Sequence, residues 1–410
     1  MKVFYDFIVF LASLFLPIAA VFNKKIKLFV AGRKQTFSKI AALKNKKTLW
    51  FHAASLGEFE QARPIIAVLK KKFPDYKILI TFFSPSGYEI RKKYDLADVV
   101  CYLPLDSNSN AKKFVGLVNP TLAVFIKYEF WPNLLDALKK KEIPTILVSG
   151  IFRKKQIFFK YYGGFMRNSL KAFHHFFVQD KNSKQLLTRI QFENISVVGD
   201  TRFDRVSEIL KQDNSQDFIT AFKDNTYTVV AGSTWQEDEA LFVNYINHVA
   251  TEEEKFIIAP HNIKQDSILA FQKALQKKSV LFSEKATKNL KEYQVFIIDT
   301  IGILTKIYSA ADTAYVGGGL KTGLHNILEP AIFGVPIVIG NKYDKFKEAL
   351  DLVALKGVIS IENQEEFTNQ LRVLRKDDLY RTSTGEINKK YIQDHRGATQ
   401  SIVEWVQEKI

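Results

Sequence analysis

The stretch of this sequence best suited to chemistry is a glycine-rich loop between two apolar runs. The first run ends at Val316, and three glycines, among them Gly318 and Gly319, follow it. Glycines let a backbone approach a ligand closely, and free N–H groups at the start of the next predicted helix, near Asn326, would attract a phosphate. Glu329 would then lie within reach of ribose hydroxyls. The alternative is a tight turn in which Glu329 only complements the helix dipole.

A second candidate is Glu58, which follows a buried strand predicted at residues 50–54. Ser55 to Glu58 fits the S-x-x-E capping box, in which the glutamate accepts a hydrogen bond from the backbone of the cap residue. A carboxylate at the carboxyl end of a strand is also placed to act as a general base toward a sugar hydroxyl. The sequence leaves both roles open.

Polar or glycine-bearing loops follow the other predicted strands as well. Ligands of parallel sheets bind at the carboxyl ends of the strands, so these loops are candidate site segments. Lys127 and Glu129 could equally form an ordinary ion pair, and His261 could be an ordinary loop histidine. The candidate residues in these loops are Ser84, Ser86 and Gly87, Lys127 and Glu129, Arg202, Ser233 and Thr234, Pro260 and His261, and Ile301, Gly302 and Ile303.

The elements that must position these residues alternate between apolar runs and helix-like segments. This alternation predicts parallel sheets covered by helices on both faces, in two α/β halves that face each other across a cleft. A polar stretch at 213–225 separates the halves. The predicted strands are residues 50–54, 78–83, 99–103, 122–126, 145–148, 176–178 and 196–198 in the first half, and 227–231, 255–259, 295–298, 313–316 and a run after Pro336 in the second.

Composition limits the class of partner and the compartment. The chain has 410 residues and a net charge of +16, which favours an anionic surface or substrate. Its single cysteine, Cys101, excludes an internal disulfide or a cysteine metal site and fits a reducing cytoplasm. No D-x-D triplet, nucleophile motif or zinc spacing is present. We therefore expect neither a metal nor a cofactor.

The N-terminus predicts a membrane anchor. Residues 3–22 form an almost uninterrupted apolar run, and lysines at 24, 25 and 27 follow it, which would keep the body on the cytoplasmic side. The charge follows the apolar run rather than preceding it, which disfavours a cleaved signal peptide. Asp6 and Pro17 make a helix lying in one leaflet an alternative to a spanning helix. A buried helix of the soluble body is the third possibility.

Residues 153–177 interleave basic and aromatic side chains. Such a segment suits phospholipid headgroups and the membrane interface, or a core helix with a solvated basic face. It could also suit single-stranded nucleic acid, although no nucleic-acid motif accompanies it.

Together these segments resemble the Kdo transferases, a family of GT-B glycosyltransferases that move 3-deoxy-D-manno-octulosonate (Kdo) from CMP-Kdo onto lipid A precursor (lipid IVA). The resemblance covers nearly the whole chain. The matching segments are H-A-A-S-L-G-E-F-E with Glu58, T-F-F-S-P-S-G-Y-E, E-F-W-P-N from Glu129, G-D-T-R-F-D, G-S-T-W-Q-E-D-E, D-T-I-G-I-L, and V-G-G-G-L followed by G-L-H-N-I-L-E-P.

The resemblance implies a membrane anchor at 1–22, an acceptor domain at 23–205 and a nucleotide-sugar domain at 206–410, whose last helix could pack back on the first domain. It implies an inverting transfer in lipopolysaccharide core biosynthesis at the cytoplasmic face of the inner membrane, with no metal. Glu58 would be the base, with Lys127 or Glu129 assisting, Arg202 would stabilise developing phosphate charge, and Ser84, Ser86 and Gly87 would lie on the acceptor side. The donor would be held by Ser233, Thr234, Pro260, His261, Ile301, Gly302, Ile303, Gly318, Gly319, Asn326, Ile327, Leu328 and Glu329.

Two positions depart from the family pattern. Members often carry an acidic residue where Lys127 stands and an arginine where His261 stands. The rival functions are another GT-B glycosyltransferase, a sugar-nucleotide epimerase of the same architecture and, from a different class, a membrane-tethered nucleic-acid-binding protein. An epimerase needs no anchor, and a nucleic-acid-binding protein does not explain the glycine loop with Glu329.

Overall fold

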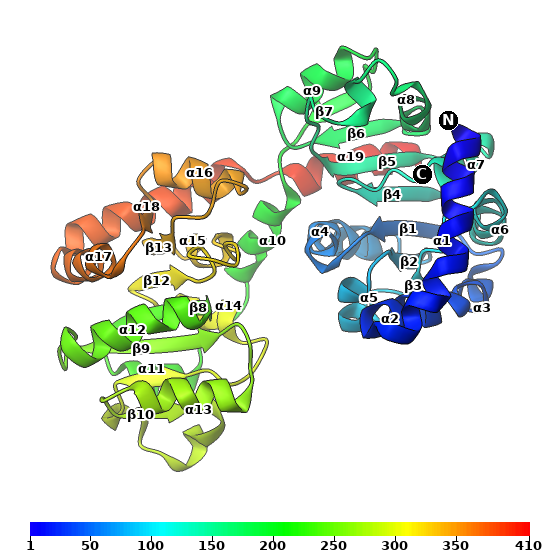
Figure 1. The fold of residues 1–410 in the computed structure, drawn as a ribbon. Helices are drawn as coiled ribbons and strands as arrows, with labels where there is room; N and C mark the ends of the chain where they lie inside the picture. Colours follow the sequence, from blue (N-terminus) through cyan, green and yellow to red (C-terminus); the bar gives the residue numbers. More distant parts are fainter. The chain divides into compact units, whose positions relative to one another are not determined.

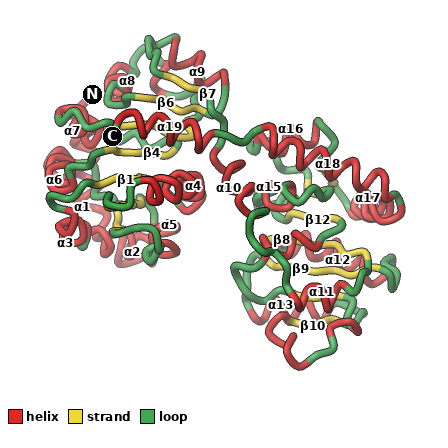
Figure 2. The backbone as a smooth tube through the Cα atoms, turned by 180° about the vertical axis from the view of Figure 1, so that it is seen from behind, coloured by secondary structure: helices red, strands yellow, loops and turns green.

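The computed structural model describes residues 1–410, which divide into two compact units. Unit 1 comprises Met1–Arg205 together with Arg396–Ile410, and unit 2 comprises Val206–His395. Helix α10 (Thr201–Ile209) runs across the division, and the C-terminal helix α19 (Ala398–Lys409) belongs to unit 1. Each unit contains one parallel sheet between helices (Figures 1 and 2). The prediction of two α/β domains with parallel sheets is confirmed.

The sheet of unit 1 has seven strands in the order β3-β2-β1-β4-β5-β6-β7. All seven were predicted to within about two residues, because strands buried on both faces read as continuous apolar runs. The strands are β1 (Thr48–Ala53), β2 (Lys77–Phe82), β3 (Val99–Tyr102), β4 (Leu122–Ile126), β5 (Thr145–Gly150), β6 (His175–Val178) and β7 (Ile195–Val197).

Alternate residues of these strands enter two cores, one on each face of the sheet. Trp50 and Phe125 pack with α6 and α7, whereas Phe51 and Val124 pack with α4 and α19. The helices of unit 1 other than α10 and α19 are α1 (Lys2–Phe22), α2 (Lys24–Lys34), α3 (Thr36–Ile40), α4 (Leu56–Lys72), α5 (Pro85–Arg91), α6 (Asn108–Val118), α7 (Pro132–Lys140), α8 (Gly164–Leu170) and α9 (Lys181–Thr188), with short 3-10 turns at Ala41–Leu43 and Ile157–Phe159.

Helix α1 is long and apolar enough to cross a membrane, and none of its residues is buried. It lies along one side of unit 1, and α2 packs at its C-terminal end (Figure 1). The possibility that it is a buried core helix is therefore wrong. The basic and aromatic segment 153–177 is also not one helix, because it divides into the turn Ile157–Phe159, the short α8 and the strand β6.

Unit 2 repeats the architecture with strand order β10-β11-β9-β8-β12-β13-β14. The prediction missed both edge strands, β10 and β14, which are short and only partly buried. The strands are β8 (Tyr227–Thr234), β9 (Glu254–Pro260), β10 (Ser279–Leu281), β11 (Val295–Ile297), β12 (Thr313–Val316), β13 (Ile337–Gly340) and β14 (Val358–Ile361).

One core of unit 2 lies between its sheet and α12, α13 and α17, where Phe242, Tyr315 and Phe367 pack edge to face. The helices of unit 2 are α11 (Asp217–Lys223), α12 (Gln236–His248), α13 (Gln265–Ala274), α14 (Leu304–Ile307), α15 (Leu328–Ala331), α16 (Lys347–Ala354), α17 (Gln364–Lys376) and α18 (Asp378–Asp394), with 3-10 turns at Phe282–Thr287, Leu290–Glu292 and Tyr308–Ala310.

Candidate active site

In unit 1, Glu58 and Glu129 lie beyond the carboxyl ends of two neighbouring strands. β1 and β4 pair in parallel, so the loops that follow them emerge at the same edge of the sheet. Glu58 is in the first turn of α4, directly after β1, and Glu129 follows β4 just before α7. The topology therefore brings together two carboxylates that are 71 positions apart in the sequence.

Glu58 forms the capping box and still has an oxygen available. Its Oε2 accepts hydrogen bonds from the backbone N–H groups of Ala54 (2.7 Å) and Ser55 (3.1 Å), whereas Oε1 accepts none. Burial raises the pKa of Glu58, and the charge of Glu129 raises it further, against the lowering effect of the two backbone bonds and of Lys127. Capping thus fixes the carboxylate in position and leaves one oxygen available for a substrate hydroxyl.

Glu129 is held by a buried network that sequence reasoning did not find. Its Oε2 lies 3.0 Å from His52 Nε2 and 2.9 Å from Trp131 Nε1. The opposite side of the His52 ring contacts Thr81, with Nδ1 2.8 Å from the threonine Oγ1. His52 is fully buried, and a histidine within a mostly apolar strand, three residues before Ser55 of the S-L-G-E loop, was the available signal.

Two other candidates of unit 1 flank these carboxylates. Lys127 directly follows β4 and has a φ of +63°, which is unusual for a residue with a side chain and costs backbone strain. Ser84 caps α5 after β2, and its hydroxyl lies 2.6 Å from that of Ser86. The next residue, Gly87, is buried against the Phe82 ring, which leaves no room for a Cβ.

Arg202 is engaged within unit 1 at the start of α10. Its Nε donates to Asp200 Oδ2 at 2.8 Å, and its backbone N–H donates to the same carboxylate. Asp200 is buried and also accepts hydrogen bonds from the Gln61 and Gln179 side chains. Any contact between Arg202 and a phosphate would therefore have to share the guanidinium with Asp200.

In unit 2, the glycine loop at the end of β12 is packed tightly against its surroundings. A Cβ on Gly319 would lie 2.8 to 3.0 Å from the backbone of Gly340, and a Cβ on Gly317 would lie 2.4 Å from the Ser233 carbonyl oxygen. Gly318 has a φ of +89°. These glycines are required by the packing of neighbouring strand ends and by the turn itself.

The expected anion site at the start of the next helix is not supported. That helix, α15, has only four residues, so few aligned peptide dipoles point along it. The N–H of Gly318 donates to Asp238 Oδ2 at 2.9 Å, and the N–H of Gly317 donates to the Gly232 carbonyl oxygen. The helix ends early at the turn that leads into Gly334, whose φ is +72°.

Glu329 is instead part of a polar cluster on α15. It accepts hydrogen bonds from Asn326 Nδ2 (3.0 Å) and from the Thr305 hydroxyl on α14. Ile327 and Leu328, between them, are buried. Of the preceding loop, Ile301 is 86% exposed, Gly302 has a φ of +99°, and Ile303 directly precedes α14. The structure thus groups the 301–303 and 326–329 segments around Thr305.

Three stacked rings lie at the carboxyl ends of β8, β9 and β12. His261 stacks on Trp235 and on His325, with ring centroids 4.7 and 4.4 Å apart, and Trp235 Nε1 donates to His325 Nε2 at 3.0 Å. Burial lowers the pKa of His261 and lowers that of His325 to about 4. The stack is therefore uncharged at neutral pH. Sequence reasoning did not single out Trp235 and His325, because the contacts join residues 26 to 90 positions apart.

Beside the stack is a polar cavity of about 330 Å³ at the start of α12. Thr234 lines it, and its hydroxyl donates to Glu239 Oε1 at 3.1 Å. Burial raises the pKa of Glu239 to about 7. Ser233, with a φ of +55°, precedes Thr234, and Pro260 pairs with Thr234 across β8 and β9. No group of three or more His, Cys, Asp or Glu side chains is placed to hold a metal ion.

Comparison with known proteins shows which enzymes this chain is similar to. Residues 31–205 match the family model described as 3-deoxy-D-manno-octulosonic-acid transferase (kdotransferase). A 3-deoxy-D-manno-octulosonic acid transferase of Haemophilus influenzae is 27% identical over 378 residues, which cover 87% of this chain and 86% of that protein. Most of the chain is therefore similar to Kdo transferases, and residues 31–205 match their family model. The segment matched by the family model contains Glu58, Lys127, Glu129 and Arg202.

Solved structures show that the chain has a GT-B type fold. The UDP-GlcNAc 2-epimerase of Neisseria meningitidis matches with a TM-score of 0.61 and 15% identity, covering 88% of this chain and 100% of that chain. MurG of Acinetobacter baumannii matches with a TM-score of 0.54 and 13% identity, covering 88% of this chain and 99% of that chain. Likeness at such low identity establishes the fold only.

Proposed function

We propose that this protein is an inverting glycosyltransferase that moves Kdo from CMP-Kdo to a lipid A precursor. The observation that carries the proposal is the position of Glu58, inside the segment that matches the Kdo transferase family model and beside Glu129. The fold alone would also suit an epimerase. The family match and the exposed apolar helix α1 favour the transferase.

In the proposed reaction Glu58 acts as general base. Its Oε1 takes the proton of an acceptor hydroxyl, the hydroxyl oxygen forms a bond to the anomeric carbon, and the bond from that carbon to the CMP phosphate oxygen breaks. Attack from the side opposite the leaving phosphate inverts the configuration. A pKa raised by burial brings the carboxylate closer to neutral pH, where a general base is most effective.

We assign donor binding to unit 2, at the carboxyl ends of β8, β9, β11 and β12. The polar cavity lined by Thr234, the three-ring stack and the Asn326–Glu329 cluster would surround the nucleotide. Lys264 and Lys321 also line the cavity and supply positive charge toward a phosphate. Lys321 is shared with Glu237, to which it is ion-paired. Fixed cations of this kind can carry the charge of the leaving group.

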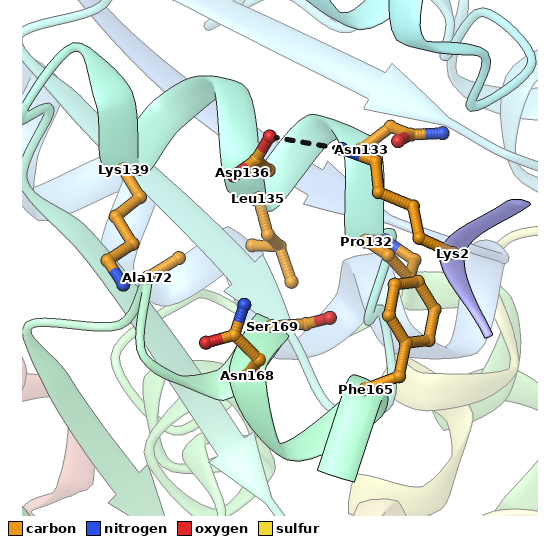
Figure 3. A pocket seen from close by; sticks show the side chains of 10 residues that line it. All are labelled: Lys2, Pro132, Asn133, Leu135, Asp136, Lys139, Phe165, Asn168, Ser169 and Ala172. Carbon is orange, nitrogen blue, oxygen red and sulfur yellow. Dashed lines mark ion pairs between the residues drawn. The ribbon is translucent and has the colours of Figure 1, made fainter.

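We place the protein on the cytoplasmic face of the inner membrane, with α1 lying along the surface. The N-terminal end of α1 is tied to the body of unit 1, because Tyr5 donates to Asp106 Oδ2 (2.8 Å) and Asp6 accepts from Asn133 (2.7 Å). Lys2 Nζ lies 3.5 Å from Asp136 Oδ2 (Figure 3). A helix tied to the body at its first turn cannot carry that turn across a bilayer. This supports a helix in one leaflet rather than a spanning one.

The outward face of α1 is suited to lipid. It exposes ten large apolar side chains, each at least 48% accessible, and the lysines of α2 follow at its C-terminal end. An apolar face beside basic residues binds the interface of an anionic membrane. The exposed residues are Val3, Phe4, Phe7, Ile8, Phe10, Leu14, Phe15, Ile18, Val21 and Phe22.

One incubation tests the reaction. The purified full-length protein is mixed with CMP-Kdo and a tetraacylated lipid A precursor without added metal, and the lipid is weighed by mass spectrometry. We expect a gain of one or more Kdo units, which also counts the transfers. An unchanged lipid mass, with heat-denatured protein as the matched blank, would contradict the proposed acceptor. If the protein also fails to bind CMP, the assignment of CMP-Kdo as the donor would be contradicted.

A further inference from the structure

A second cavity lies in unit 1 between α1, α2 and α3, and none of the candidate site residues lines it. Its volume is about 320 Å³, at the lower end of the range for small-molecule sites. The C-terminal half of α1 contributes to the lining together with α2 and α3. Most of the walls are apolar, including Leu16 and Pro17 of α1, Val30 of α2, and Pro104 and Leu105 after β3.

One wall of this cavity carries a buried cation without an acidic partner. Arg33 uses Nη1 and Nη2 to donate to the carbonyl oxygens of Phe29 (3.0 Å) and Phe83 (2.8 Å). Its Nε is buried and has no hydrogen-bond partner, and no carboxylate pairs with it. The guanidinium carbon lies 3.4 Å from the centre of the Phe29 ring. Burial lowers the pKa of Arg33 to about 9, which indicates a charge stabilised only in part by carbonyls and ring faces.

These two features together define the chemistry of a ligand. The apolar walls exclude free phosphate or a nucleotide, which would lose its hydration without replacement. The unpaired guanidinium disfavours a neutral hydrocarbon, which would leave the buried N–H unsatisfied. An amphiphile with an acyl chain and an anionic head satisfies both, because the chain fills the cavity and the head accepts from Arg33. Lys34 lines the same cavity and adds positive charge.

The position of the cavity indicates where such a ligand would come from. α1 supplies one wall with Leu16 and Pro17, and Leu14 and Val21, which lie on the same side of the helix as Pro17, belong to its exposed apolar face. The lining is therefore continuous with the surface that we place in the membrane. We propose that this cavity binds one acyl chain of a bilayer phospholipid, with the lipid phosphate against Arg33.

The test uses the purified full-length protein and a monomeric probe. Dihexanoyl phosphatidylglycerol is titrated below its critical micelle concentration, and native mass spectrometry counts the lipids bound per chain. We expect one lipid per wild-type chain. Dihexanoylglycerol, which lacks the phosphate, and glycerol 3-phosphate, which lacks the chains, should bind at least about tenfold more weakly, because each satisfies only one of the two features.

Two variants and a matched control separate the cavity from general surface charge. Val30→Trp fills the cavity, and Arg33→Gln removes the cation, so each should weaken phospholipid binding about tenfold or more. Lys27→Gln makes the same charge change on the same helix at an exposed position and should leave binding unchanged. Equal binding by wild type and Val30→Trp, or an equal loss in Lys27→Gln, would overturn the proposal.

A competition arm identifies the source of the lipid. Tetraacylated lipid A precursor is added to the phospholipid-loaded protein, and the bound species are weighed again. Retention of the phospholipid supports a bilayer lipid. One-for-one replacement by the precursor would overturn that source and assign the cavity to the acceptor. Val30→Trp keeps the test valid if Arg33→Gln fails to fold, as judged by thermal melting.

Discussion

His52 and Glu129 face each other at the ends of the neighbouring strands β1 and β4, with Nε2 3.0 Å from Oε2. Because Thr81 and Trp131 hold the same pair, the Glu129 carboxylate has a fixed position. Its charge acts on Glu58, whose pKa it raises in addition to the larger effect of burial. The pair therefore tunes the candidate base without any direct hydrogen bond to it.

This arrangement predicts a shift in the pH profile of Glu129→Gln. The substitution removes a negative charge near Glu58, so the pKa of Glu58 falls and its ionised form persists at lower pH. The acidic limb of kcat/KM should move to lower pH, whatever happens to the maximum rate. Asp136→Asn, on α7 and not among the groups that affect Glu58, should leave the limb in place. An unmoved limb in Glu129→Gln would contradict the coupling.

Glu58→Gln tests the base itself. The amide oxygen can still accept from the Ala54 and Ser55 N–H groups, so the helix start and the melting temperature should change little. Activity should fall by about 10² to 10⁴, because an amide cannot take the proton. Glu366→Gln is the matched control, since Glu366 Oε2 accepts from the Glu362 N–H at 2.9 Å, four residues earlier, as Glu58 does from Ala54. Near-normal turnover in Glu58→Gln would leave the residue only its capping role.

Particular strands and helices show which parts of the fold could be predicted from the sequence. Strands such as β4 were predicted because a strand that is buried on both faces has a continuous run of apolar residues. The edge strand β10 has one fully buried residue, Val280, and leaves no such pattern. The helix after the glycines was predicted too long, because the apolar residues after Ala331 form a turn instead of a further turn of helix.

The site was predictable where function depends on local spacing. Glu58 could be found because its capping box spans four consecutive residues. His52 could not, because its role depends on Glu129 and Thr81, which pairing of distant strands brings together. The stack of His261 on His325 and the bond from Gly318 to Asp238 have the same origin. Long-range contacts of this kind have no signature in a single sequence.

We predict that the buried carboxylate of Asp238 stabilises the glycine loop. Its carboxylate is fully buried and accepts from the Trp235 and Gly318 N–H groups and from the Tyr315 hydroxyl. Asp238→Ala leaves three donors unsatisfied, at about 1–3 kcal/mol each. Hydrogen–deuterium exchange of residues 313–324 should accelerate, and CMP binding should weaken. Tyr315→Phe removes one of the three donors instead of their acceptor and should have a smaller effect. Unchanged exchange in Asp238→Ala would contradict the assignment.

Because the ring stack is uncharged, we predict that a permanent positive charge at position 261 strengthens CMP binding. Burial keeps the pKa of His261 below its usual value, so at pH 7 position 261 carries no charge toward a phosphate. His261→Arg should strengthen CMP binding several-fold at pH 7.5, because a charge-assisted contact is added. Wild-type affinity should rise when the pH falls far enough to protonate His261, and the arginine variant should respond less.

Isothermal titration calorimetry at several pH values measures this effect. Gln276→Arg adds the same charge to unit 2 at an exposed position after α13 and should change CMP affinity little. If both arginine variants gain equally, long-range attraction explains the result and the stack has no contact with the phosphate.

The tie between α1 and the body predicts on which side of the membrane the N-terminal end lies. Cys101 is buried and its thiol pKa is raised to about 12 by burial, so the natural chain should react little with a maleimide. Lys2→Cys places a reactive thiol at the first turn of α1. A membrane-impermeant maleimide added to inside-out vesicles, which expose the cytoplasmic face, should label it, as it should label the body-side control Lys27→Cys. Labelling of position 2 only in right-side-out vesicles would show that α1 spans the bilayer and would overturn the in-plane arrangement.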